Sequence, residues 1–315
     1  MTVPDHDGLP VVTLPASDPA DVLTLLGVRP SRVRPLADVP LGNGNWLVET
    51  DGGEPSVLRR YHPETAPEDL RYEHAVLAYV AGAGWVVPTA LTAPVRWHDR
   101  WWCLTRHVPG QGTRAEDARQ CVRRGRDLAR LHLALRGAAD RIGPRPGWRP
   151  QHTAVTIQAR DRWEARVEGL ASASPRLAAW SRAAAAETRA ALAAVGADDL
   201  PVMVVHGDFA AWNVHYEGDV LAGVIDFELT HVDSRPYELA IARGYRAPDM
   251  VAAYRAELDE QGWPLSELEE AAIDPVYRAF RVGMAAAEMH DGDVTGRYDL
   301  AMIERQLART GTPPP

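Results

Sequence analysis

Residues 201–240 read PVMVVHGDFAAWNVHYEGDVLAGVIDFELTHVDSRPYELA, and this stretch decides the fold of the chain. It contains two apolar runs, at 202–205 and 220–225. Each run has the length and composition of a short buried strand. A polar loop with Asp208 and Asn213 follows the first run, and the second run is followed by Asp226. The stretch therefore predicts two strands that present three oxygen-bearing side chains on neighbouring loops.

These three side chains are of the types that phosphoryl transfer requires. One carboxylate orients the attacking hydroxyl, while an Asn and a second Asp hold Mg²⁺. In this interpretation Asp208 is the catalytic residue, and Asn213 and Asp226 are the metal ligands. The alternative is an ordinary hairpin in which the same Asp and Asn side chains cap turns.

The segments HGDFAAWN (206–213) and IDFE (225–228) resemble the catalytic and metal-binding segments of a known family. These are the aminoglycoside phosphotransferase-like small-molecule kinases, relatives of the protein kinases. An isolated HGD would say little, because such turns are common in loops. Here two half-motifs occur thirteen positions apart, counted from Asn213 to Asp226, and each follows an apolar strand. The resemblance implies ATP and Mg²⁺ as cofactors, and it extends from about residue 31 to about residue 303.

The resemblance also implies an α+β, two-lobed, protein-kinase-like fold. An N-terminal nucleotide-binding lobe, residues 1–108, would contain a small antiparallel β-sheet. A mainly helical lobe, residues 109–315, would contain the catalytic and acceptor sites. Strands are expected at 31–36, 46–50, 56–61, 86–88 and 101–104, and helices at 18–27, 67–81, 113–135, 154–170, 174–195 and 249–274. The first ten residues and the tail 310–315 are expected to be frayed.

Two segments of the first lobe are candidates for nucleotide binding. The first consists of Gly42, Asn43, Gly44 and Asn45, where the family has the loop that closes over the ATP phosphates. Glycine lets the backbone come close to a phosphate, although the same residues equally make a plain hairpin turn. The second includes Thr105 and His107 and resembles the hinge. There, backbone groups would meet the adenine edge.

The chain has no lysine, so all 34 of its basic residues are arginines. Arg59 takes the place of the phosphate-binding lysine of kinases. Arginine keeps a fixed charge and a planar fork of donors, so it can still hold phosphate oxygens. The resemblance implies that Glu73 pairs with Arg59; the alternative is an ordinary surface glutamate. Arg60 is expected on the opposite face of the strand, in contact with solvent.

Composition limits the class of protein. A chain of 315 residues with 46% hydrophobic and 24% charged residues can bury a large core. Its net charge of −9 argues against nucleic acid as a partner and is compatible with a cationic substrate. No apolar run is long enough to span a bilayer, so no membrane association is expected. Cys103 and Cys121 show no CxxC spacing, which favours a reduced, cytoplasmic protein.

Several other polar residues have structural interpretations. His132 is expected to be a hydrogen-bonded core histidine, and Glu238 is expected to anchor the catalytic loop from within the second lobe. Residues 249–274 carry eight carboxylates and one arginine, which is either a solvated face or a wall that faces the substrate. Ser266 and Glu269 fit a capping box. A surface turn is preferred over a metal site for His290, Asp291 and Asp293.

The expected reaction is transfer of the ATP γ-phosphoryl group to a hydroxyl of a small molecule. Aminoglycoside-type or other amine-bearing compounds would suit an acidic cleft, but homoserine, choline-like alcohols and sugars remain open. The missing lysine motivates a rival, a non-catalytic nucleotide-binding protein. Retention of Asp208 with both metal ligands argues against it. A protein acceptor is disfavoured, because no recognisable activation segment follows Asp226.

Overall fold

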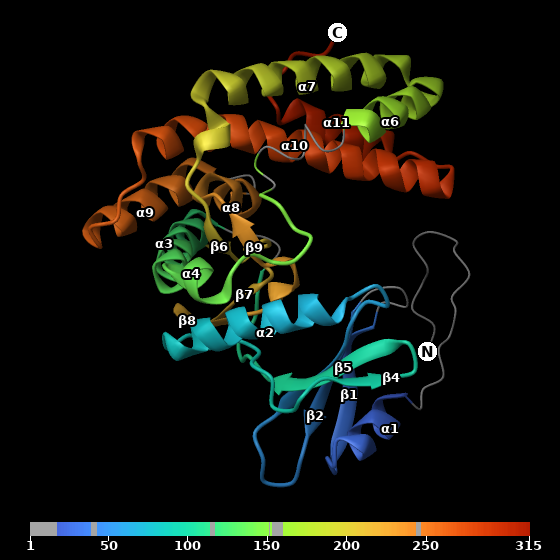
Figure 1. Cartoon of the computed structure of the whole chain (residues 1–315), viewed down its shortest axis with the longest axis vertical. Coiled ribbons are helices and arrows are strands. Elements are labelled where there is room, and N and C mark those ends of the chain that lie inside the picture. Colours follow the sequence, from blue (N-terminus) through green and yellow to red (C-terminus); the bar gives the residue numbers. More distant parts are fainter. Residues whose placement is uncertain (1–17, 39–42, 114–116, 151, 153–159, 244–246) are drawn as a thin grey trace. The chain divides into compact units, whose positions relative to one another are not determined.

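The computed structural model describes residues 18–38, 43–113, 117–150, 152, 160–243 and 247–315 (Figure 1). The described chain divides into two compact units. The first holds the residues up to Gly110 together with Ala222–Ile225, and the second holds Gln111–Leu221 and Asp226–Pro315. One unit contains a small antiparallel sheet and the other is mainly helical, so the predicted α+β class is confirmed.

The first unit is built on a five-stranded sheet with two helices. Its elements are α1 (Asp18–Leu25), β1 (Arg32–Asp38), β2 (Gly44–Glu49), β3 (Ser56–Arg60), α2 (Pro67–Gly82), β4 (Val95–Trp97) and β5 (Arg100–Arg106). The strand order is β1-β2-β3-β5-β4, and every pair is antiparallel. The strand predicted at 86–88 is absent from these described elements. Pro88 has no amide N–H for a ladder, and β4 forms the edge of the sheet instead.

The two faces of the sheet have different cores. On one face, Trp46, Leu58 and Trp102 pack with Leu23 of α1. On the other face, Tyr61 and Cys103 pack with Leu70 of α2. Because successive strand residues point to opposite faces, neighbouring residues of β3 enter different cores.

Arg59 and Arg60 demonstrate this alternation. Arg59 lies opposite Cys103 of β5 in the strand register, and Arg60 lies opposite Trp102. The expectation that Arg60 is solvated is wrong, since it is only 3% exposed. Its guanidinium lies 5.3 Å from the ring centre of Trp46 and 5.8 Å from that of Trp102. A guanidinium is weakly hydrated and stacks on aromatic faces, so it can enter an apolar core.

The second unit is mainly helical. Its helices are α3 (Ala118–Leu135), α4 (Ala138–Ile142), α6 (Arg160–Ala173), α7 (Pro175–Val195), η1 (Ala197–Asp199), η2 (Phe227–Leu229), α8 (Arg235–Ala242), α9 (Ala247–Glu260), α10 (Glu267–Thr295) and α11 (Leu300–Ala308). The predicted capping box of Ser266 and Glu269 starts α10, and a second one, Asp117 with Gln120, starts α3. The start of the helix predicted at 154–170 lies outside the described residues.

Helices α6, α7, α10 and α11 share one apolar core, and Figure 1 shows α7 running alongside α10. The tail beyond α11 is held against α7, so its predicted fraying is wrong as far as Thr312. Trp180 donates its ring N–H to the Thr312 carbonyl at 2.9 Å, and the Thr312 hydroxyl donates to Glu187 at 2.7 Å. No helix among the described residues is both long and apolar enough to cross a membrane.

Two short strand pairs lie next to the catalytic loop. They are β6 (Met203–Val205) with β9 (His231–Asp233), and β7 (Val214–Glu217) with β8 (Val220–Val224). Val204 and Val205 are fully buried. The residues that follow β6 and β8 are therefore attached to strands fixed by apolar packing, which is what a rigid site requires.

Candidate active site

The loop that follows β6 folds back on itself around Asp208. The Asp208 amide donates to Nδ1 of His206 at 3.1 Å. Asn213 donates its side-chain amide to the Asp208 main-chain oxygen at 2.9 Å and to Oδ2 of the Asp208 carboxylate at 2.8 Å. The loop therefore brings the predicted catalytic residue and the first predicted metal ligand into direct contact.

Glu238 of α8 anchors this loop through hydrogen bonds, as predicted. Its carboxylate is fully buried and accepts the amide of Gly207 at 3.0 Å and the amide of Phe209 at 3.2 Å. Burial raises the pKa of Glu238 to about 7, although the amide hydrogen bonds act in the opposite direction. The two bonds fix the backbone on both sides of Asp208.

Gly207 is required by both conformation and space. Its φ is +88°, a region that favours glycine. A Cβ at this position would lie 2.1 Å from the carbonyl oxygen of Leu229. Any other residue would push the catalytic loop away from the loop that follows β8.

Asp226 lies at the start of that second loop. Its φ is +68° and its ψ is +59°, an uncommon conformation for a residue other than glycine. Arg145 holds the loop by donating to the carbonyls of Glu228 at 2.6 Å and Thr230 at 3.0 Å. The backbone at Asp226 is therefore held in place by contacts from outside its own strand. This backbone sets the direction of the Asp226 side chain.

The carboxylate of Asp208 has unusual electrostatics. Burial, followed by the nearby negative charges of Asp226 and Glu228, raises the pKa of Asp208 to about 6. The hydrogen bond from Asn213 partly opposes this shift. The shift shows that Asp208 and Asp226 are close enough to repel each other. A carboxylate with a pKa nearer to neutrality is also better suited to accept a proton.

The donor set fits a divalent cation. The Asn213 amide nitrogen is used on Asp208, which leaves its Oδ1 as an acceptor, and Asp226 supplies a carboxylate. Hard cations such as Mg²⁺ prefer oxygen ligands and usually complete their shell with water and substrate phosphates. In the described part of the chain, no three His, Cys, Asp or Glu residues cluster as a metal site. A cation here would therefore depend on Asn213 and on phosphate oxygens.

In the first unit, the candidate phosphate residues share one face of the sheet. Asn45 of β2 and Cys103 of β5 lie opposite Arg59 in register. Glu73 of α2 is only 5% exposed, so it is not a surface glutamate. The charges of Glu73 and Arg59 both act on the pKa of Cys103, which burial raises to about 11. Arg59 and Glu73 thus lie near the same thiol, and Asn45 lies on the other side of Arg59 in the sheet.

The remaining residues predicted to bind the nucleotide lie in different structural settings. Gly42 lies outside the described residues. Asn43 accepts the amide of His62 at 2.8 Å, and Gly44 is the first residue of β2. Thr105 lies within β5, where its hydroxyl donates to the Val57 carbonyl at 3.2 Å. His107 follows the end of β5 and is half-buried.

Two arginines that position the site were not identified from the sequence. Arg124 of α3 donates to the carbonyls of Phe209 at 3.1 Å and Ala242 at 2.7 Å, so it holds the catalytic loop from the α3 side. Arg124 lies four and eight positions before Leu128 and His132, on the buried face of α3. That spacing could have identified it. Arg145, in the Pro- and Gly-rich loop after α4, offered no comparable pattern.

His132 has the structural role expected of it. It is fully buried and hydrogen-bonds through Nδ1 to the Tyr254 hydroxyl at 2.7 Å. Burial lowers its pKa to about 3, so its ring stays neutral. His290, Asp291 and Asp293 lie in α10 and not in a turn, because the helix continues to Thr295.

The acidic segment 249–274 is a solvated face only in part, because most but not all of its carboxylates are exposed. Half of its eight carboxylates form ion pairs with arginines. The pairs are Glu257–Arg130 at 2.9 Å, Glu269–Arg235 at 2.6 Å, Glu270–Arg255 at 2.5 Å and Asp274–Arg243 at 2.7 Å. Glu257 and Glu269 are buried, so the segment includes charge pairs that join helices of the second unit.

Comparison with known proteins identifies the family of this chain. A model of the phosphotransferase enzyme family matches residues 36–269. The chain is 28% identical over 267 residues to homoserine kinase of Rhodospirillum rubrum, covering 79% of this chain and 77% of that protein. It is 27% identical over 265 residues to homoserine kinase of Gluconobacter oxydans, covering 79% of each.

A solved structure of aminoglycoside phosphotransferase APH(4)-Ia, a thermostable mutant in complex with ADP and hygromycin B, superposes with a TM-score of 0.67 at 17% identity. The match covers 94% of this chain and 97% of that one, and it confirms the predicted protein-kinase-like fold. The chain therefore belongs to the phosphotransferase enzyme family and is an enzyme of the small-molecule kinase class.

Proposed function

We propose that this enzyme transfers the γ-phosphoryl group of ATP to a hydroxyl group of a small molecule. The arrangement of Asp208, Asn213 and Asp226 carries the proposal. Asp208 orients the acceptor hydroxyl and accepts its proton as the new O–P bond forms. Its raised pKa, caused by burial and by the charge of Asp226, suits a proton acceptor.

A bound Mg²⁺ would neutralise phosphate charge, and Asn213 and Asp226 are the residues that would hold it. Asn213 would contribute its Oδ1, because its amide nitrogen is hydrogen-bonded to Asp208. Asp226 is held ready by its loop and by the contacts of Arg145 with that loop. These residues thus orient the nucleotide, and Asp208 remains available to the acceptor.

In this proposal, residues 1–108 bind the nucleotide and the rest of the chain provides catalysis and the acceptor site. Arg59, paired with Glu73, binds phosphate oxygens. Asn45, in register with Arg59 and on the same sheet face, supports this assignment. The loop that contains Gly44 approaches the phosphates, and the backbone near His107 meets the adenine. The two cysteines, Cys103 and Cys121, are buried and not joined in a disulfide, which supports a reducing, cytoplasmic setting.

The rival, a nucleotide-binding protein without catalysis, does not account for Asp208. Ionised Asp208 is unfavourable in this site, because it is buried and close to Asp226. A protein that only bound nucleotide would be more stable with a neutral residue there. Retention of this carboxylate on a loop fixed by Glu238 is explained by a role in the reaction.

The test uses two variants of the full chain. Asp208→Ala should lower kcat by about 10³-fold or more while ATP–Mg²⁺ still binds. Asp226→Asn should weaken Mg²⁺-dependent nucleotide binding itself. Calorimetric nucleotide titration with and without Mg²⁺, and a coupled ADP assay, measure both effects. Asp259→Asn, an exposed carboxylate of α9, is the matched control. Wild-type turnover by Asp208→Ala would remove Asp208 from its role.

A further inference from the structure

A pocket of about 380 Å³ lies beside the catalytic loop. It is lined by Trp148, Arg149, Leu229, His231 and Tyr237 together with Gly207, the residue that directly precedes Asp208. Its volume is near the lower end of the range for small-molecule sites. No acidic residue is among the described residues that line it. A polycationic acceptor would find none of the carboxylates that it needs on these walls.

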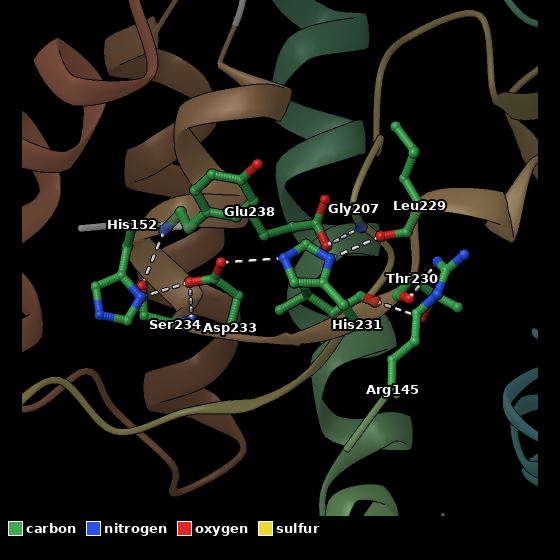
Figure 2. A network of polar contacts seen from close by, with 11 residues as sticks. Arg145, His152, Gly207, Leu229, Thr230, His231, Asp233, Ser234 and Glu238 are labelled. Carbon is green, nitrogen blue, oxygen red and sulfur yellow. Dashed lines mark hydrogen bonds and ion pairs between the residues drawn. The ribbon is translucent and has the colours of Figure 1, made fainter. Parts of the chain in front are cut away.

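Both ring nitrogens of His231 have polar partners in this pocket. Its Nδ1 faces the Leu229 carbonyl at 2.7 Å, and its Nε2 faces the Asp233 carboxylate at 3.0 Å (Figure 2). These two contacts fix the orientation of the ring in the pocket wall. Hydrogen bonds from His152 and His231 outweigh burial and lower the pKa of Asp233, which keeps it ionised. The pair of His231 and Asp233 is therefore fixed in position.

Trp148 forms an aromatic wall of the pocket, and a cation lies behind its ring. The guanidinium of Arg145 lies 4.0 Å from the ring centre of Trp148 while it donates to the carbonyls of Glu228 and Thr230. A cation attracts the negative face of an aromatic ring. Because Arg145 already occupies one face of Trp148, an ammonium group on the pocket side would meet a like charge behind the ring.

Two side chains of the pocket can bind a ligand directly. Arg149 is exposed on the pocket rim and carries a permanent charge. The Tyr237 ring is fixed against His231, with ring centres 5.7 Å apart, and against Phe280, with ring centres 6.4 Å apart. Among the described residues, none forms a hydrogen bond with the Tyr237 hydroxyl. Gly207, the residue before Asp208, lines the same pocket as Tyr237, so this phenol belongs to the wall beside the catalytic loop.

We propose that the acceptor is a compact hydroxy compound that carries a carboxylate and that this pocket binds it. Arg149 pairs with the carboxylate, and the Tyr237 hydroxyl donates a hydrogen bond to the acceptor beside Asp208. The inference rests on the proposed phosphoryl transfer and assigns its substrate class. Amino-sugar polycations are excluded from the pocket by its charge.

The test compares hydroxy compounds that differ only in the carboxylate. The pairs are L-homoserine with 3-aminopropan-1-ol, L-serine with 2-aminoethanol, and D-glycerate with ethane-1,2-diol; hygromycin B is the polycation. Turnover is followed by ADP release with Mg²⁺–ATP, and acceptor binding is followed by calorimetry without nucleotide. At least one carboxylate should exceed its partner in kcat/KM by about 10- to 100-fold, the loss expected for one charge-assisted hydrogen bond.

Variants then assign the discrimination to the pocket. Arg149→Ala should reduce the kcat/KM ratio of the best pair to within about threefold, mainly by raising KM for the carboxylate. Tyr237→Phe keeps the ring and should lower carboxylate affinity about 3- to 10-fold. Arg126→Ala removes an exposed arginine of α3, and Tyr298→Phe removes a hydroxyl that bonds Asp293. Both controls lie outside the lining of this pocket and should leave the ratio unchanged.

The outcomes separate the inference from the proposed function. If 3-aminopropan-1-ol or hygromycin B is phosphorylated as well as or better than every carboxylate, the inference fails and phosphoryl transfer stands. An unchanged ratio in Arg149→Ala likewise overturns the inference alone. If ATP is bound and no acceptor in the panel is phosphorylated or bound, the carboxylate assignment is wrong. Absence of nucleotide binding overturns the proposed function together with the inference.

Discussion

Strand β3 of the first unit and the loop around Asp208 in the second unit hold their charges in different ways. In the first unit, two neighbouring arginines of β3 lie over aromatic rings. Arg60 contacts Trp46 and Trp102 on one face, and Arg59 lies 5.0 Å from the ring centre of Tyr61 on the other. A guanidinium has a delocalised charge and weak hydration, so it tolerates an aromatic environment.

In the second unit, buried carboxylates are held by hydrogen-bond donors. Glu238 accepts the amides of Gly207 and Phe209, and Asp208 accepts from Asn213. An ionised carboxylate can only accept hydrogen bonds, so it needs N–H groups at fixed positions. We therefore expect that loss of an aromatic contact changes the specificity of the enzyme little. Removal of a buried acceptor should instead disturb the whole loop around Asp208.

The largest effect is expected for Glu238→Ala. Two buried amides lose their acceptor, which should lower the free energy of unfolding by about 2–5 kcal/mol. Urea denaturation monitored by circular dichroism measures the change. Glu267→Ala, an exposed glutamate in the first turn of α10, is the control and should stay within about 0.5 kcal/mol. A loss as small as that of the control would mean that the amides do not depend on Glu238.

Arg59→Ala should raise the barrier to phosphoryl transfer by about 2–4 kcal/mol, because a charged donor to the phosphate is lost. Arg59→Lys should recover only part of this loss, since an ammonium lacks the planar fork. The measurement is kcat/KM for ATP, read as a difference in barrier height. If Arg59→Ala leaves kcat/KM for ATP unchanged, Arg59 does not bind the phosphates.

Arg60→Ala sharpens the comparison because Arg60 lies one residue away in the other core. Loss of its stacking and of its buried stem should cost about 1–3 kcal/mol of unfolding free energy. Its kcat/KM for ATP, corrected for the folded fraction, should stay close to that of the wild type. A damaging kinetic effect without loss of stability would mean that Arg60, and not Arg59, serves the nucleotide.

The smallest effect concerns the titration of Asp208. The folded protein binds this proton more tightly than the unfolded chain, because the pKa of Asp208 is raised to about 6 from 3.8. Its ionisation therefore costs stability as pH rises between these values. Asp208→Asn should match the wild type near pH 4 and become more stable near pH 7. The full shift corresponds to about 3 kcal/mol, and because Asp208 is partly exposed and screened by solvent we expect about 1 kcal/mol. The comparison is made by urea denaturation without metal, and an equal difference at both pH values would contradict the shift.

Much of the fold could be predicted because local patterns determine it. The apolar runs around Asp208 and Asp226, the turn residues and the helical periodicity of α3 depend on neighbours in the sequence. The approach of Asp208 to Asn213 was predictable for the same reason, since five residues of one loop separate them. Glu238 could be predicted only through the family resemblance. The strand predicted at 86–88 is absent because Pro88 has no amide N–H to donate to a neighbouring strand.

Burial of charge could not be read from the sequence. Arg60 was expected in solvent because alternation predicts a face and not what covers that face; α1 and two tryptophans cover it. The acidic segment is expected to be solvated or to face the substrate, but arginines from elsewhere in the second unit pair with three of its eight carboxylates. Partners that are distant in sequence determine these environments.

The sequence alone determined the chemistry of this protein, because HGD with Asn213 and Asp226 places the reacting groups within one short stretch. Only the tertiary structure decided what surrounds them. The ring of His231 is fixed because Leu229 and Asp233 contact its two nitrogens, and the pocket beside Gly207 combines segments from residue 147 to residue 237. A reactive motif is local, whereas the electrostatic field that selects an acceptor is the sum of charges brought together by folding.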